Sequence, residues 1–314
     1  MSGLTNGSHP DPTVLLCYDG SRESAIAIAR AGELVSARRA VVANVWEGVA
    51  TLRQAPLAGP SPSAIADAAG MIDDNDRDRA QKLAAEGVAL ARDAGFDATA
   101  VPLRLERNVW WTLNEYAKKH HINTIAVGAR GRSRVARTLL GSTSSGLLHH
   151  ATATVLVVPA TATEPSGGPV MFCDDGSDNA RQAVRRGRQL LRGAGMVVSL
   201  WRSWAVNVPY MVVGAGAAVG MAEELDKGNE EQASETAAEG AQAAAEGGTG
   251  CHSESVRCDG PTWRGLLDTA NDRDAAAIVV GTRGMTGIAG ALGSVATAVS
   301  QHSPRPVLVV PPTR

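Results

Sequence analysis

The amino-acid sequence predicts two tandem α/β domains, each a doubly wound, Rossmann-like unit with a five-stranded parallel sheet. Three observations support this prediction. The chain has 314 residues, enough for two domains of about 150 residues each. The second half repeats the pattern of the first half. Within each half, short apolar runs alternate with stretches of helical spacing, which is typical of a parallel sheet covered on both faces, and we expect the strand order 3-2-1-4-5.

The internal repeat is most evident at the start of each half. The stretch VLLCYDGSRESAIAIARAGELV, residues 14–35, matches VMFCDDGSDNARQAVRRGRQLL, residues 170–191. The offset between equivalent residues falls from 156 to 152 along the chain, as a tandem duplication with short deletions would give. A small-residue stretch rich in Pro and Gly separates the halves and is typical of a linker. The predicted divisions are a flexible tail at 1–12, a first domain at 13–160, a linker at 161–168 and a second domain at 169–314.

Each element of the first half has a signal of its own. The apolar run 14–18 predicts the first strand, and Ser21 is a suitable cap for a helix that ends near residue 35. The same alternation predicts strands at 41–45, 98–103, 124–127 and 155–158, and helices at 75–94, 110–120 and 142–150. In the second half, the apolar, Gly-rich stretch 208–225 favours a loop, with a partner-binding or lid segment as the alternative.

Composition limits the classes of function. The net charge of −2 predicts no general attraction to nucleic acid or to an anionic membrane. The sequence contains no apolar run of the roughly 18–20 residues that span a bilayer, and its first residues do not resemble a signal peptide, so we expect a cytoplasmic protein. The four cysteines are too few for a disulfide framework, and the seven-residue separation of Cys251 and Cys258 is poor spacing for zinc, so no metal site is expected.

Two loops with unusual composition follow the first and fourth strands, which are neighbours in the expected order. Gly128 and Gly131 allow backbone N–H groups to approach an anion closely. Gly141 and Ser142 precede a helix, whose N-terminus favours a phosphate. Asp19 would repel a phosphate, so we expect it at the other end of the ligand, accepting hydrogen bonds from a ribose hydroxyl or an adenine amino group. The pattern therefore predicts a nucleotide site.

Simpler interpretations of the same residues remain open. The glycines could be ordinary turn residues, and Asp19 and Asp175 could be helix caps. The loop after the fourth strand also carries cations that could hold phosphates or simply be solvated, namely Arg130, Arg132, Arg134 and Arg137.

The spacing Gly128-x2-Gly131-x9-Gly141-Ser142 after an apolar strand, with YDGS after the first strand, resembles the nucleotide-binding signature of the universal stress protein family. The resemblance covers nearly the whole chain as two copies. It implies an ATP-binding protein of the stress response with a regulatory role, the ligand being ATP with or without Mg²⁺. It also implies that Asp19 and Val45 contact the adenosine end. The phosphates would then be held by Val127, Gly128, Arg130, Gly131, Gly141, Ser142 and Thr143.

The second copy departs from this spacing. Only eight residues separate Gly284 from Gly293, which shortens the reach of the loop by up to about 3.5 Å. One cation, Arg283, remains in this loop, and Asp174 adds a negative charge beside Asp175. We therefore expect a second site weaker than the first. Its residues would be Asp175, Leu200, Val280, Gly281, Arg283, Gly284, Gly293 and Ser294.

The sequence favours a binding protein over an enzyme. We find no compelling Ser/His/Asp or Cys/His arrangement and no Gly-x4-Gly-Lys-Ser/Thr loop, so at most weak ATP hydrolysis is expected and no catalytic residue is assigned. Two alternatives stay open: a slow ATPase or adenylyl-transferring enzyme on the same scaffold, and a ligand-free duplicated interaction scaffold. Besides the nucleotide, the expected partners are the two domains for each other and a second copy of the chain. The family resemblance implies that the two domains pair through strands 155–158 and 307–310.

Overall fold

The computed structural model describes residues 12–48, 62–131, 140–164, 166–204, 215–246, 250–282 and 292–312. The first half contains β1 (Thr13–Cys17), α1 (Arg22–Leu34), β2 (Arg39–Trp46), α2 (Pro62–Asp93), β3 (Asp97–Arg104), α3 (Val109–Lys119), β4 (Thr124–Gly128), α4 (Ser142–His150) and β5 (Thr154–Val158). The second half contains β6 (Val170–Cys173), α5 (Asp178–Leu190), β7 (Gly195–Trp201), α6 (Ala215–Glu246), β8 (Cys251–Arg257), α7 (Thr262–Asp272), β9 (Ala277–Gly281), α8 (Ser294–His302) and β10 (Val307–Val310).

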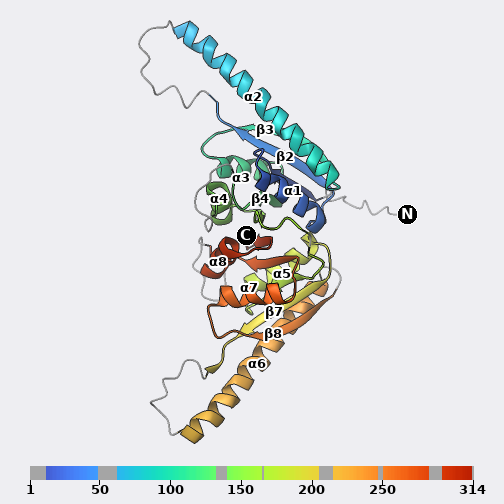
Figure 1. The fold of residues 1–314 in the computed structure, drawn as a ribbon, viewed down its shortest axis with the longest axis vertical. Helices are drawn as coiled ribbons and strands as arrows, with labels where there is room; N and C mark the ends of the chain where they lie inside the picture. The colour runs from blue at the N-terminus through green and yellow to red at the C-terminus, as the bar shows by residue number, and fades with distance from the viewer. Residues whose placement is uncertain are drawn as a thin grey trace, which may run out of the picture.

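Each half forms a parallel sheet with the predicted order. The first half reads β3-β2-β1-β4-β5 and the second reads β8-β7-β6-β9-β10, which is 3-2-1-4-5 in both cases. The prediction of two tandem Rossmann-like domains is therefore confirmed. In Figure 1 the two halves stack along the long axis of the molecule.

The two sheets continue into one another, because β5 and β10 pair antiparallel. Leu156 lies opposite Leu308, and these two residues are equivalent positions of the two copies. A second contact has the same symmetry: Val35 pairs with its equivalent Leu191 in an isolated antiparallel bridge. Reciprocal hydrogen bonds flank that bridge, from Ser36 N–H to Leu190 O at 2.8 Å and from Arg192 N–H to Leu34 O at 2.7 Å. The halves are thus related by a local two-fold axis.

Apolar side chains cover both faces of the sheet, and each face has a core that runs through both halves. One core packs under α1, α2, α5 and α6 and includes Leu16, Phe172 and Leu308. The other packs under α3, α4, α7 and α8 and includes Leu15, Leu113 and Met196. Successive residues of a strand point to opposite faces, so the two cores alternate along β1.

A serine caps the helix after the first strand of each half, as predicted for Ser21. Ser21 and Ser177 are the N-caps of α1 and α5, and each hydroxyl accepts a hydrogen bond from the N–H three residues later, at 3.2 Å in both halves. The residue before each cap is a glycine with φ of +82°, Gly20 and Gly176. A side chain is strained in that left-handed conformation, so the DGS turn needs its glycine.

Two helices are longer than the sequence predicted. Helix α2 begins at Pro62 rather than near residue 75, and residues 215–225, expected to form a loop, belong to α6. The Ala-rich composition of both segments favours a helix, and proline is well tolerated at the first helical position. These helices extend away from the sheet at opposite ends of the molecule (Figure 1). The predicted tail, apart from Pro12, and residues 208–214 lie outside the described residues. Within the described ranges, the structure contains no helix both long and apolar enough to cross a membrane.

Candidate functional site

A cavity of about 260 Å³ lies at the carboxyl ends of β1, β2 and β4, beside α3 and α4. This is the edge at which ligands bind to open α/β sheets. All nine positions predicted for the first copy line it: Asp19, Val45, Val127, Gly128, Arg130, Gly131, Gly141, Ser142 and Thr143. Sequence reasoning missed the apolar wall that Val109 and Leu113 of α3 contribute. Their four-residue spacing on one helix face was the signal that could have identified it.

The Asp19 carboxylate is held by the turn after β1. Its Oδ1 accepts hydrogen bonds from Ser21 N–H at 3.0 Å and from the Ser21 hydroxyl at 2.5 Å. The interpretation of Asp19 as the helix cap is therefore wrong, because Ser21 is the cap and Asp19 orients it. Asp175 has the same relation to Ser177, at 3.1 Å.

Asp19 also lies against the glycine-rich loop. A Cβ atom placed on Gly131 would be 2.7 Å from Asp19 Oδ2, so a side chain there would collide with the carboxylate. The sequence predicted that Asp19 and this loop lie at opposite ends of a ligand, and the structure instead places them in contact. Ser21 engages Oδ1, and Oδ2 is the carboxylate oxygen nearest to the Cβ position of Gly131.

Backbone hydrogen bonds close the glycine-rich loop at its base. Ala129 N–H donates to Val158 O at 2.7 Å, and Gly141 N–H donates to Ala129 O at 2.8 Å. The Ser144 hydroxyl donates to Ala129 O as well, at 2.8 Å. A Cβ on Gly128 would lie 2.9 Å from Arg130 O and 3.1 Å from the Glu23 carbonyl oxygen, so this position between the loop and α1 has no room for a side chain. Arg132, Arg134 and Arg137 lie outside the described residues.

The N-terminus of α4 adds a second polar element to the cavity. Gly141 is the N-cap and has no side chain to use the first N–H groups of the helix. Ser142 and Thr143, the first two helical residues, line the cavity. The positive end of the helix dipole therefore lies at the rim, where it favours an anion. Cys17 at the cavity floor offers no nucleophile, because burial and the neighbouring Asp19 raise the pKa of its thiol to about 12.

The second copy keeps the closure of the loop. Gly293 N–H donates to Thr282 O at 2.6 Å, which is the equivalent of the Gly141–Ala129 bond. The missing residue therefore falls between Thr282 and Gly293, and the expected shortening does not alter the base of the loop. Arg283 and Gly284 lie outside the described residues. The other predicted positions lie at the same strand and helix ends as in the first copy: Leu200 in β7, Val280 and Gly281 in β9, and Gly293 and Ser294 at the start of α8.

Comparison with known proteins agrees with this architecture. The model of the Universal stress protein family matches the chain twice, over residues 12–159 and 168–311. The chain belongs to this family. A universal stress protein of Mycolicibacterium smegmatis is 31% identical over 204 residues, which cover 60% of this chain and 61% of that protein. The match thus spans less than two thirds of that relative.

Solved structures share the tandem fold. A universal stress protein from Archaeoglobus fulgidus DSM 4304 superposes with a TM-score of 0.60 at 18% identity, covering 96% of this chain and 99% of that one. A functionally unknown protein from Pseudomonas aeruginosa PAO1 gives a TM-score of 0.53 at 15% identity, covering 96% and 93%. At these identities the likeness extends to the fold alone.

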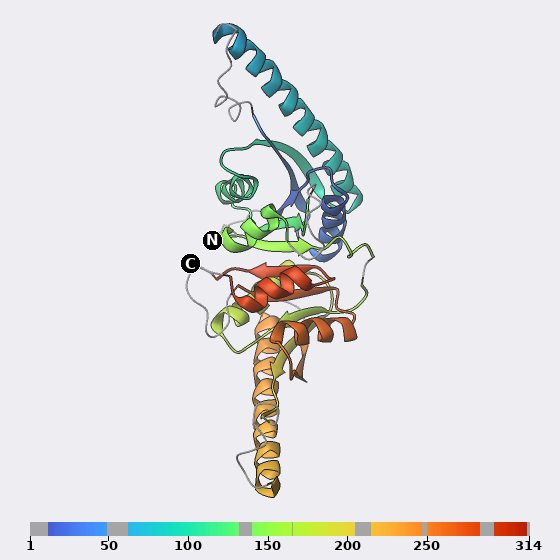
Figure 2. The ribbon, with the colours of Figure 1, turned by 60° about the vertical axis from the view of Figure 1, so that its left-hand side comes forward.

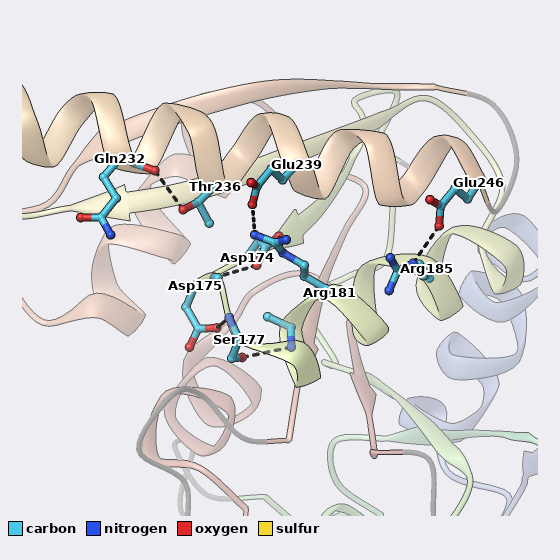
Figure 3. Close-up of polar contacts among 11 residues, drawn as sticks. Asp174, Asp175, Ser177, Arg181, Arg185, Gln232, Thr236, Glu239 and Glu246 are labelled. Atoms are coloured by element: carbon cyan, nitrogen blue, oxygen red, sulfur yellow. Dashed lines mark hydrogen bonds and ion pairs between the residues drawn. The ribbon is translucent and has the colours of Figure 1, made fainter.

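The second universal stress protein domain differs from the first beneath its long helix (Figure 3). Asp174 replaces Tyr18 and is 3% exposed. It points toward α5 and α6, so its charge does not lie in the predicted second site, contrary to the expectation from sequence. Its Oδ1 accepts from Gly176 N–H at 2.8 Å, and its Oδ2 lies 3.8 Å from Arg181 Nε. Arg181 also forms an ion pair with Glu239 of α6.

Burial dominates the electrostatics of this cluster. Asp174 Oδ2 and Arg181 Nε are both buried, and neither has a hydrogen-bond partner among the described residues. Burial raises the pKa of the Asp174 carboxyl, while the Gly176 N–H and Arg181 oppose the rise. The first domain has Tyr18 and Ala25 at the positions of Asp174 and Arg181, so these positions form no ion pair in the first domain.

Both domains share a stack of a tryptophan on a histidine, at equivalent positions of the two copies. Trp110 stacks on His150 with ring centroids 4.6 Å apart, and the equivalent Trp263 stacks on His302 at 4.8 Å. In the first domain this stack fixes α3 against α4, whose N-terminus lines the cavity. Gly146 of α4 makes the approach possible, because a Cβ there would lie 2.1 Å from Trp110 Cδ1.

We expect Gly146→Ala to lower the free energy of unfolding by about 1–3 kcal/mol, the usual cost of overpacking. The loss should occur although alanine is the better helix former by up to about 1 kcal/mol. Gly70 of α2 is the matched control, because a Cβ placed there has no described atom within 4 Å beyond its chain neighbours and the backbone of its own helix. Urea unfolding should therefore show a lower free energy of unfolding for Gly146→Ala and an unchanged or higher one for Gly70→Ala. Equal effects of the two substitutions would contradict the contact with Trp110.

Proposed function

We propose that the first domain binds ATP in the 260 Å³ cavity and that the protein is a nucleotide-dependent regulator of a stress response rather than a catalyst. One observation carries the proposal: a carboxylate, a glycine-rich loop and a helix N-terminus line the same cavity at the carboxyl edge of the sheet. The membership of the universal stress protein family supports the same assignment.

The chemistry of the lining suggests how the nucleotide would lie. Val45, Val109 and Leu113 offer an apolar surface for the base. Asp19 adjoins Gly131, so we assign it to the ribose hydroxyls, between the base and the phosphates. The N–H groups of the loop and of α4 would hold the phosphates, with Arg130 as an ionic partner. A volume of about 260 Å³ lies just below the usual range for small-molecule sites, so the phosphate chain would lie along the rim.

The proposal also covers the second domain, the place of Mg²⁺, and the location and assembly of the protein. The second domain would bind ATP more weakly, because Asp175 is exposed whereas Asp19 is half-buried. Among the described residues, the structure contains no group of three or more His, Cys, Asp or Glu side chains that could hold a metal ion, so Mg²⁺ would enter with the phosphates. We also propose a cytoplasmic location, pairing of the domains through β5 and β10, and further dimerisation of the chain.

Ser142→Glu tests the proposal without threatening the fold. Ser142 is exposed at the first position of α4, where a carboxylate stabilises the helix through its dipole by about 0.3–1 kcal/mol. The same carboxylate would repel the phosphates, so ATP should bind at least about tenfold more weakly, a loss of about 1.4 kcal/mol. Ser294→Glu is the matched control at the first position of α8. Calorimetric titration of the full chain with ATP measures both.

Each outcome of this titration has a distinct meaning. Loss of one site with Ser142→Glu and no change with Ser294→Glu would assign binding to the first domain. Two sites, each lost with its own substitution, would assign one nucleotide to each domain. Undetectable binding by the unsubstituted protein would refute the proposal and favour the interaction scaffold. Multiple turnover of ATP above a mock-purified control would favour the slow ATPase.

A further inference from the structure

A second and larger cavity, of about 670 Å³, lies where the two domains and their linker meet. Its walls come from the end of α1, the linker around residues 161–168, the turn after α5 and the segment 304–306. Figure 2 shows the linker passing between the halves on the side of the molecule where α1 lies. The volume falls within the usual range of about 300–1,000 Å³ for small-molecule sites.

Arg30 of α1 lines this cavity, and part of its guanidinium lacks hydrogen-bond partners among the described residues. The residue is 7% exposed and lines the cavity. Its Nη2 forms an ion pair with Glu33, but its Nε and Nη1 are buried and have no hydrogen-bond partner in the described part of the chain. A buried guanidinium with unused N–H groups is unfavourable, because these donors have lost water without gaining an acceptor, and an anionic acceptor would remove that cost.

The other charged groups around the cavity limit the ligand. Arg305 is engaged by the protein, through Asn271 Oδ1 at 3.3 Å, Asp274 Oδ1 at 3.0 Å and Ala275 O at 2.5 Å. Arg192 lies on the rim and donates to Ser36 O at 3.4 Å, near the long limit for a hydrogen bond. Glu33 and Glu164 also line the cavity. Burial and the charge of Glu164 raise the pKa of Glu33, although Arg30 opposes the rise.

We propose that this cavity binds a small molecule carrying one carboxylate or phosphate group, seated on Arg30 with Arg192 as a second cation. The fork of a guanidinium suits both groups. The two glutamates disfavour a polyanion such as ATP, which separates this site from the nucleotide site. A ligand here would contact α1, the linker and the second domain together, and would therefore stabilise the packing of one domain on the other.

Hydrogen exchange on the full chain locates such a ligand. Inorganic phosphate and acetate serve as probes, with chloride at equal ionic strength as the reference. Amides of residues 30–36 and 161–168 should exchange more slowly, by a factor of about 10 when the probe is at about ten times its Kd. Slowing confined to 127–131 and 140–148 would instead report phosphate at the glycine-rich loop, so the two sites are distinguished.

Two variants and one control decide the assignment. Arg30→Met and the rim variant Arg192→Met, which changes an exposed side chain, should each abolish the slowing at 161–168. Arg186→Met is the matched control, because Arg186 is the equivalent of Arg30 on α5 and is not among the cavity's lining residues. Slowing by phosphate alone or by acetate alone would support the proposal and name the chemical class. No slowing with either probe, or slowing that survives Arg30→Met, would overturn it.

Discussion

Leu308→Ala should lower the free energy of unfolding by about 3 kcal/mol, within the range of about 2–5 kcal/mol for a fully buried leucine. Leu308 and Leu156 are both fully buried and lie opposite each other where β10 meets β5. The two side chains are the equivalent residues of the two domains, at the local two-fold axis. Truncation of either leucine opens a cavity at the same place, so Leu156→Ala should lower the free energy of unfolding by a similar amount.

A double-mutant cycle tests whether this junction is one shared core. The combined substitution of Leu156 and Leu308 should differ from the sum of the single costs by about 0.5–3 kcal/mol, as residues in contact do. Leu16→Ala is the control, because Leu16 is also fully buried but lies in β1, separated from β10 by β4 and β5. The loss of unfolding free energy caused by Leu16→Ala should simply add to the loss caused by Leu308→Ala. Urea unfolding measures all five variants, and additivity between Leu156 and Leu308 would show that the halves do not share a core there.

The strand order was accessible from sequence because the informative residues follow strands. Apolar runs placed the strands, and the order 3-2-1-4-5 expected of a doubly wound sheet made the first and fourth strands, with their unusual loops, neighbours. The Gly-rich signature and the family resemblance together selected nine of the residues that line the first cavity. Such signals are local in sequence, and the topology of a doubly wound sheet brings them together without further information.

Features that depend on the direction in which a side chain points could not be predicted from such local sequence signals. The position of Asp19 beside Gly131 depends on the direction of the carboxylate, which the spacing of residues in the sequence does not reveal. The burial of Asp174 could have been inferred from alternation along the strand. Its equivalent Tyr18 packs in the core under α1 and α2, on the face opposite to Cys17. The repeat itself therefore carried the information that the Asp174 side chain faces α5 and α6.

Arg181→Met should destabilise the protein by about 2 kcal/mol near neutral pH. The substitution leaves the Asp174 and Glu239 carboxylates without their shared cation (Figure 3). Removing one member of a buried ion pair costs about 3–5 kcal/mol, and the cost should be smaller here because the Arg181 side chain is 28% exposed. Arg185→Met is the matched control: it breaks the neighbouring pair with Glu246, whose two side chains are 48% and 67% exposed, and it should cost little.

The cost of Arg181→Met should also depend on pH, and the sign follows from Asp174. Burial raises the pKa of this carboxyl in the folded protein, so the folded state holds the proton more tightly than the unfolded state. Stability is therefore lost as pH rises through the folded-state pKa and regained as pH falls toward the ordinary value of about 3.9. Arg181 lowers the pKa of Asp174, whereas Asp175 and Glu239 raise it, so the variant should have a still higher pKa. The loss of unfolding free energy caused by Arg181→Met should therefore shrink as the pH is lowered, whereas the small loss caused by Arg185→Met should not change with pH. A loss for Arg181→Met that is independent of pH would mean that other groups keep Asp174 charged.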